Sequence, residues 1–273
     1  MIQTAEFGPV TRFDLTRPVP GLPNYWTTCY WVDGLLVDSG CAHSASQLLA
    51  QLNGKPVHTI VNTHTHEDHI GANGPLQRQY PDMGIFAHPL ALPVLADPHH
   101  RQPLHPYRRL FWGWPGPSTG NPACDGQVIS TPSFSFQVIY TPGHSLDHLC
   151  LYEPSQGWLF TGDLFVGGQD RAMRQGTDVW GIIASLKKLQ SLPAGWLFPG
   201  SARVRQDPGT ELVAKIAYYQ EFGESVFDLQ RQGIPFNHIV RRLCGPPMRV
   251  ERITFGHFAR RHMVQSYLSP HHT

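Results

Sequence analysis

The spacing of apolar residues along the chain predicts strands in its first third. Residues 25–32 and 35–38 alternate or run apolar on either side of Asp33-Gly34. Asp-Gly is favoured in tight hairpin turns because both central positions take positive φ. This segment is therefore predicted to form a β-hairpin.

Short apolar runs typical of strands recur through most of the chain, and segments with helical spacing lie between several of them. The runs predicted as strands are 57–61, 83–87, 134–140, 149–152, 158–161 and 196–198. The segments predicted as helices are 44–52, 89–96 and 178–189. The alternation of strand and helix suggests parallel pairing with helices covering a sheet face, which predicts an α/β fold.

Two segments depart from this alternation. Residues 97–131 are rich in Pro, His, Trp and Gly, and no regular element is predicted there; loops of this length are usually functional or mobile. From residue 211 onward helical spacing dominates, over 211–230, 236–243 and 252–268, with no strand signal. We therefore expect a main domain over 1–205 and a helical C-terminal extension over 206–273 that packs on the same core.

Composition narrows the class of protein. The 273 residues are 41% hydrophobic, enough to bury a sizeable core. Lys and Arg number 21 against 20 Asp and Glu, a balance that provides no basic surface for a phosphate backbone. No window approaches the roughly 18 apolar residues that a membrane span requires. We expect neither nucleic acid nor membrane as a partner, and the oligomeric state is not predicted.

The cysteines and the N-terminal stretch indicate the cellular compartment in which the protein is expected. The N-terminal stretch lacks a basic segment leading into an apolar core, so no signal peptide is predicted. The cysteines are odd in number and never arranged as CxxC, which argues against a disulfide framework and a cysteine-ligated zinc site. They are Cys29, Cys41, Cys124, Cys150 and Cys244. Reduced thiols and a cytoplasmic location are the expectation.

The stretch VNTHTHEDHIGANG, residues 61–74, concentrates chemistry-bearing side chains directly after a predicted strand. It supplies three imidazoles and one carboxylate within six residues: His64, His66, Asp68 and His69. A loop that curls can point the first two imidazoles one way and the remaining pair toward a neighbouring point. Imidazole and carboxylate both bind transition metals, so the stretch predicts two adjacent metal ions.

Two later motifs extend this pattern: TPGHSLDH, which contains His144, and LFTGDLF, which contains Asp163. In this order the three motifs resemble those of the metallo-β-lactamase-fold metallohydrolases, over most of residues 25–205. The resemblance implies an α/β fold, an αββα sandwich of two mixed sheets flanked by helices. The overall size and the helical C-terminal segment resemble the glyoxalase-II-related branch of that family.

The same resemblance implies the ligand sets of two metals. His64, His66 and His144 would hold one metal. Asp68, His69 and a bridging Asp163 would contribute to the second.

One expected ligand is missing from the second set. The family usually supplies a histidine after the last core strand, where this chain reads LFPGSARV with Ser201 in that place. A neutral hydroxyl is a poor ligand for such metals. The second site should be weaker, completed by water, or filled by another histidine such as His257, for which a surface or packing role is the commoner reading.

The function expected from these residues is hydrolysis with a metal-activated hydroxide. Zinc is the expected metal, one or two ions per chain, with iron or manganese as alternatives. The substrate would be a small molecule with an ester, thioester, lactone or similar acyl bond, and Asp68 would orient the water or shuttle its proton. One alternative is a persulfide-dioxygenase-like redox enzyme with a single iron on His64, His144 and Asp163. Another is a non-catalytic ligand-binding or sensor protein.

Overall fold

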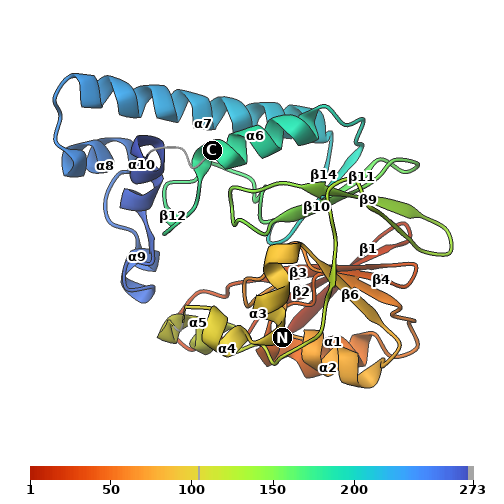
Figure 1. The fold of residues 1–273 in the computed structure, drawn as a ribbon. Coiled ribbons are helices and arrows are strands. Elements are labelled where there is room, and N and C mark those ends of the chain that lie inside the picture. Colours follow the sequence, from red (N-terminus) through yellow and green to blue (C-terminus); the bar gives the residue numbers. More distant parts are fainter. Residues whose placement is uncertain (104, 270–273) are drawn as a thin grey trace.

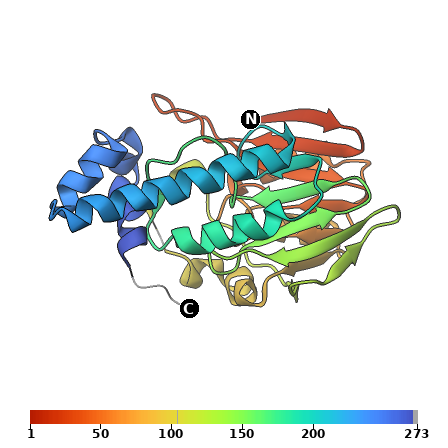
Figure 2. The same cartoon turned by 90° about the horizontal axis from the view of Figure 1, so that it is seen from above.

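The computed structural model describes residues 1–103 and 105–269, which fold as two sheets packed face to face between layers of helices (Figure 1). One sheet has seven strands in the order β1-β2-β3-β4-β5-β6-β7, and the other has six in the order β14-β13-β11-β10-β9-β8. Seen from above, α6 and α7 cross the outer face of the second sheet (Figure 2). The predicted sandwich of mixed sheets with C-terminal helices is confirmed.

The strands of the first sheet are β1 (Ile2–Phe7), β2 (Val10–Leu15), β3 (Thr27–Val32), β4 (Leu35–Val37), β5 (Thr59–Val61), β6 (Gly84–Ala87) and β7 (Asn121–Pro122). Those of the second are β8 (Val128–Ser130), β9 (Ser135–Tyr140), β10 (Leu149–Glu153), β11 (Trp158–Gly162), β13 (Trp196–Pro199) and β14 (Arg205–Gln206). A separate two-stranded sheet joins β12 (Met173–Arg174) and β15 (Phe258–Ala259).

The α-helices are α1 (Ala45–Gln51), α2 (Asn73–Gln79), α3 (Leu92–Ala96), α4 (Pro98–Arg101), α5 (Pro106–Phe111), α6 (Val179–Gln190), α7 (Pro208–Arg231), α8 (Phe236–Cys244), α9 (Arg249–Ile253) and α10 (Arg260–Leu268). Two 3-10 helices are η1 (Ala42–Ser44) and η2 (Pro89–Ala91). None of these described helices is long and apolar enough to cross a membrane.

The buried layers follow from the two-residue period of the strands. In β10, Leu149 and Leu151 face the other sheet, whereas Cys150 and Tyr152 face the layer of α6 and α7. All four side chains are buried, which explains why this strand is apolar without a break. Each sheet therefore shares one face with the other sheet and gives the opposite face to helices.

Because of the strand directions, loops from one end of each sheet meet at the candidate site. In the first sheet β4, β5 and β6 are parallel, and in the second β11 is parallel to β13. β10 pairs antiparallel with both β9 and β11, so β9 also runs in the direction of β11. The loops after β4, β5, β9, β11 and β13 carry Asp38, the His64 motif, His144, Asp163 and Gly200. Polar groups at the carboxyl ends of such strands are a usual ligand-binding arrangement in α/β proteins.

The predicted hairpin around Asp33-Gly34 is confirmed, with φ of 49° and 86° at the two turn residues. The parallel pairing of β5 with β6 is also confirmed. The hairpin of β1 and β2 has no counterpart in the sequence-based expectation.

The expectation of no regular element over 97–131 is wrong. The segment contains α4, α5, β7 and β8. Each helix is only four to six residues long and begins with a proline, which is pre-organised for the first helical position. Elements this short cannot display a helical period, and this is why spacing alone missed them.

The expectation of a strand-free extension with one helix over 252–268 is also wrong. Phe255 and Gly256 take positive φ of 52° and 79°, a conformation that ends α9. β15 follows and pairs antiparallel with β12, Met173 opposite Ala259, before α10 begins. The extension therefore contributes a strand beside the site. The domain boundary between residues 205 and 206 stays a prediction. Helices α6 and α7, which lie on either side of it, share one buried hydrophobic cluster.

Candidate metal centre and pocket

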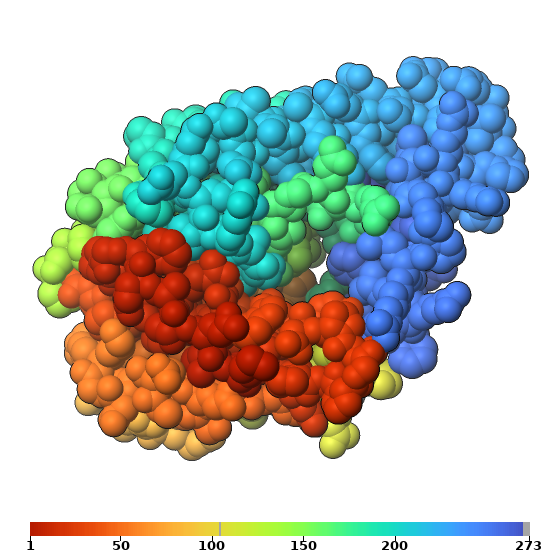
Figure 3. All heavy atoms as spheres, turned by 180° about the vertical axis from the view of Figure 1, so that it is seen from behind, coloured from red at the N-terminus to blue at the C-terminus, as the bar shows by residue number. Residues whose placement is uncertain are grey.

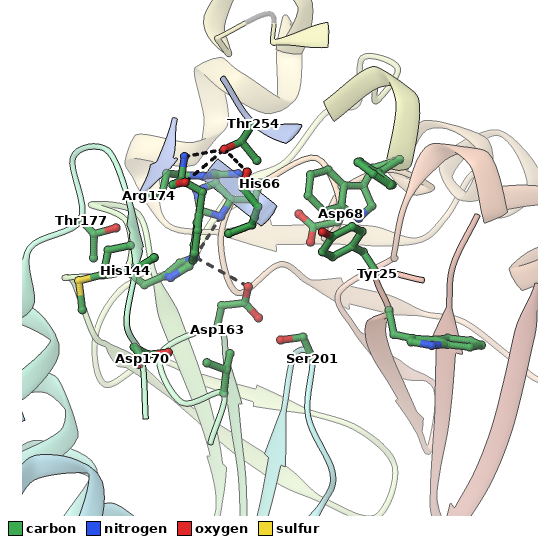
Figure 4. Close-up of a pocket in the computed structure, with 18 of the residues that line it drawn as sticks. Tyr25, His66, Asp68, His144, Asp163, Asp170, Arg174, Thr177, Ser201 and Thr254 are labelled. Carbon is green, nitrogen blue, oxygen red and sulfur yellow. Dashed lines mark hydrogen bonds and ion pairs between the residues drawn. The ribbon is translucent and has the colours of Figure 1, made fainter. Parts of the chain in front are cut away.

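The structure brings all six predicted ligands together at the shared edge of the two sheets. Figure 4 labels four of them: His66, Asp68, His144 and Asp163. Four of them follow β5, while His144 follows β9 and Asp163 follows β11. Two groups of converging ligand atoms result: His64, His66 and His144, and His64, His69 and Asp163. Asp68 joins the second group through His69.

The first group is built from three imidazole nitrogens. His66 Nδ1 lies 2.8 Å from His64 Nε2 and 3.0 Å from His144 Nε2. Burial lowers the pKa of all three histidines, that of His144 to about 4, so the rings are neutral near pH 7. Neutral nitrogen lone pairs at this distance repel one another unless they share a proton or a cation. This donor set fits a transition metal that prefers nitrogen.

The second group combines an imidazole with carboxylates. His69 Nε2 lies 3.5 Å from Asp163 Oδ2 and 3.8 Å from Asp68 Oδ2. His69 Nε2 and Asp163 Oδ1 are buried and find no hydrogen-bond partner within the described residues. Burial lowers the pKa of His69, but Asp163 and the neighbouring carboxylates outweigh it and raise that pKa well above its usual value. Buried polar atoms without a partner are costly, so these residues also fit a bound cation.

Asp38 orients two of the imidazoles, and the sequence-based reasoning missed it. Its Oδ2 accepts a hydrogen bond from His69 Nδ1 at 2.7 Å and from Thr63 Oγ1 at 2.8 Å. Because the Thr63 hydroxyl donates to Asp38, its oxygen is left to accept from His64 Nδ1 at 3.0 Å. Both histidines therefore turn Nε2 toward the cluster, which is the orientation that a carboxylate usually gives to a metal-binding imidazole.

Gln102, Arg108 and Asp147 hold the loop that carries His64, His66 and His69 in place. Gln102 donates to the carbonyl oxygen of Thr65, which lies between the first two histidines. Asp147 accepts from Thr65 N at 3.0 Å and from its Oγ1 at 2.7 Å. Arg108 of α5 makes a doubly hydrogen-bonded, buried ion pair with Glu67. The loop that carries the ligands is thus fixed by both its backbone and its side chains.

Ser201 lies on the pocket wall beside Asp163 (Figure 4). The preceding Gly200 passes so close to the cluster that a Cβ there would lie 2.6 Å from Asp163 Oδ1 and 2.9 Å from His69 Cε1. His257 lies elsewhere: its Nδ1 is 2.6 Å from the Tyr107 hydroxyl oxygen, and its ring stacks on His105. Within the described residues His257 belongs to neither ligand group.

We expect Ser201→His to raise the affinity for the second metal and to leave the first site unchanged. The backbone before this position already contacts the cluster, and the substitution adds a nitrogen donor where a hydroxyl stands. Calorimetric zinc titration of metal-free protein should show two unequal sites in the wild type and a tighter second site in the variant. His257→Ala should match the wild type. Two equally tight wild-type sites, or loss of a metal in His257→Ala, would show that the last ligand is misplaced.

A cavity of about 520 Å³ opens over the clustered histidines and carboxylates. Figure 3 shows a hollow between the orange, green and blue parts of the chain. Such a volume suits a small-molecule ligand. His66, Asp68, His144 and Asp163 contribute the polar side. The apolar wall comes from four separate parts of the chain and includes Tyr25, Trp26, Phe111, Trp112, Leu164, Met173, Ile253 and Phe258. The cavity thus has an apolar wall next to the clustered histidines and carboxylates.

Two curated relatives carry the names of hydrolases. A hydroxyacylglutathione hydrolase from Legionella pneumophila (strain Paris) is 34% identical over 152 residues, which cover 54% of this chain and 50% of the relative. An atrochrysone carboxyl ACP thioesterase from Aspergillus fumigatus is 29% identical over 174 residues, which cover 62% of this chain and 47% of the relative. The chain spans about half the length of the curated relatives it matches.

A solved beta-lactamase domain protein from Burkholderia ambifaria has the same fold, with a TM-score of 0.72 over 97% of this chain and 87% of that one at 17% identity. The sequence profile of the metallo-beta-lactamase superfamily matches residues 27–201, which contain all six clustered ligands. That match covers more than half of the chain. The chain therefore belongs to the metallo-beta-lactamase superfamily.

Proposed function

We propose that the chain is a metal-dependent hydrolase of small-molecule thioesters or related esters. The observation that carries this proposal is the convergence of nitrogen and carboxylate donors on one side of an otherwise apolar cavity. The names of the two curated relatives support a thioester in particular, since each denotes the hydrolysis of an acyl group from a thiol carrier.

We propose zinc as the metal, with one or two ions per chain, because the donors are imidazoles and carboxylates. His64, His66 and His144 would hold the first ion, and Asp68, His69 and Asp163 the second. Held by these residues, a metal would supply a water of lowered pKa, about 7, and would polarise a carbonyl oxygen. Elemental analysis of protein purified without added metal distinguishes zinc from iron or manganese.

The chain's own residues position the reactants and handle the proton. Burial raises the pKa of Asp68 to about 6, while the neighbouring His69 acts in the opposite direction. A cation beside Asp68 would favour its ionised form, which is the form that accepts a proton from an attacking water. Asp38 keeps His69 in one orientation.

The hydrolase proposal is tested with matched panels of esters, thioesters and lactones. Metal-loaded protein should hydrolyse thioesters, and metal-stripped protein should not. Oxygen consumption without hydrolysis would favour the iron redox enzyme, and ligand binding without turnover would favour the sensor. Neither alternative is supported by the names of the relatives.

Asp68→Asn should lower kcat for thioester hydrolysis by about 10²- to 10⁴-fold, the usual contribution of a general base. Metal content should fall far less, because an amide oxygen still occupies the ligand position. Steady-state kinetics and elemental analysis of the same preparation measure both quantities, with the exposed Asp228→Asn as the matched control. A parallel fall in activity and metal content would mean that Asp68 is a ligand without a proton-transfer role.

We also propose a cytoplasmic location. It is supported by the five cysteines, which are all free, four of them buried.

A further inference from the structure

Arg174 places a positive charge in the wall of the cavity, next to the metal-binding residues. It is the last residue of β12 and lines the cavity, and Figure 4 shows it beside His66. The pairing of β12 with β15 holds its backbone. Its side chain is 17% exposed, so the guanidinium is largely removed from water. A charge in this position needs a partner.

The carboxylates that line the cavity are already engaged. Asp68 and Asp163 belong to the metal-binding cluster. Asp170 accepts from Lys215 Nζ at 2.6 Å and from the Tyr219 hydroxyl at 2.5 Å. None of the three forms an ion pair with Arg174, although the charge of Arg174 is among those that oppose the rise in the pKa of Asp68 caused by burial.

The nearest carboxylate to Arg174 is Glu67, and it too is engaged. Both Glu67 oxygens accept hydrogen bonds from Arg108, and the pair is buried. Arg174 Nη2 stands 4.0 Å from Glu67 Oε1, too far for a hydrogen bond. One carboxylate thus faces two guanidinium groups. Within the described ranges Arg174 forms no other ion pair, so it has no hydrogen-bonded carboxylate of its own.

The surrounding titratable groups respond to this charge. Burial lowers the pKa of His257 to about 3, and Arg174 is the next cause. Burial raises the pKa of Tyr107, and Arg174 opposes that shift through its charge and a hydrogen bond. Neither group supplies a negative charge near pH 7.

We infer that Arg174 binds a carboxylate on the acyl group of the substrate. The planar guanidinium has five N–H donors and matches a carboxylate with two parallel hydrogen bonds. Because Arg174 adjoins His66, an anion bound there lies close to a carbonyl held at the metal centre. The inference rests on the proposed function and narrows it to acyl thioesters or esters whose acyl chain ends in a carboxylate.

A matched pair of substrates tests this preference. The succinyl and butanoyl thioesters of N-acetylcysteamine share the thiol and a four-carbon acyl chain, and differ in a terminal carboxylate against a methyl group. Wild-type kcat/KM should favour the succinyl thioester by about 10- to 100-fold, the size expected of a charge-assisted, two-bonded contact. Arg174→Gln should lose this preference mainly through KM for the succinyl substrate. Arg241→Gln, on the exposed face of α8, should retain it.

Binding of analogues that cannot be hydrolysed separates this inference from the proposed hydrolase activity. In these thioethers a CH₂ replaces the reacting carbonyl, and the carboxylate or methyl terminus is kept. Calorimetry on both metal-loaded and metal-free wild type should favour the carboxylate, and Arg174→Gln should abolish the preference in both forms. Absence of thioesterase turnover with this binding pattern would refute the hydrolase and keep the carboxylate site. Equal binding of both analogues by the wild type, or a preference unchanged in Arg174→Gln, would overturn the inference.

Discussion

Replacing His66 with alanine should remove most of the bound metal and slow hydrolysis by more than about 100-fold. His66 Nδ1 is the atom that contacts both other imidazoles of the first group, at 2.8 Å and 3.0 Å. Losing even a residue that only orients a ligand typically costs 10- to 100-fold in metal affinity or activity. Losing a ligand itself should cost more. The measurement is the metal-to-protein ratio of protein purified without added metal, followed by kcat/KM.

His238→Ala is the matched control, because His238 is an exposed histidine of α8. Its metal ratio should equal that of the wild type. Circular dichroism should show that the His66 variant is folded. A folded His66→Ala protein that keeps its full metal content would refute the assignment of the first group.

The second large effect is expected at Asp38. Asp38→Ala should destabilise the metal-free protein by about 3 kcal/mol or more, because it leaves three buried donors on Thr63 and His69 without their acceptor, at about 1–3 kcal/mol each. Alanine is also strained at the φ of 60° that Asp38 adopts. Metal affinity should fall by about 10- to 100-fold, since two imidazoles lose their fixed orientation.

Asp38→Asn separates these two causes. Asparagine tolerates positive φ and keeps one acceptor oxygen, so urea unfolding should show a smaller loss of stability. Zinc affinity, measured by competition with a chromophoric chelator, should still fall. Asp33→Asn is the control, because Asp33 also has positive φ but lies in a hairpin turn away from the cluster. Zinc affinity equal to wild type in both Asp38 variants would show that Asp38 does not orient the ligands.

The features that could be predicted are those that depend on residues close together in the sequence. His64, His66, Asp68 and His69 are close in the chain, so their spacing alone suggests a shared function. The layers were predictable because strands such as β10 are apolar without interruption and α6 has helical spacing. In both cases the pattern that permits the prediction lies within about a dozen consecutive residues.

The parts that could not be predicted depend on contacts between distant segments. Asp38 reads as an ordinary end of a strand until His69, 31 residues later, is seen to donate to it. The lack of a hydrogen-bonded carboxylate at Arg174 is recognised only when Glu67 is known to pair with Arg108, which is 41 residues from Glu67. β15 is two residues long and exists through its pairing with β12. No periodicity in the sequence carries this information.

The polar side and the apolar wall of the cavity come from different parts of the chain, and this affects how the substrate specificity could change. The clustered histidines and carboxylates follow core strands, whereas much of the apolar wall comes from the loop near Tyr25, α5, β12, α9 and β15. Substitutions at Phe111, Ile253 or Phe258 would reshape the chamber without touching a metal-binding residue. A library restricted to these wall positions would test new acyl groups and leave the clustered histidines and carboxylates unchanged. The substrate range of this fold could therefore change without loss of the residues proposed to carry the reaction.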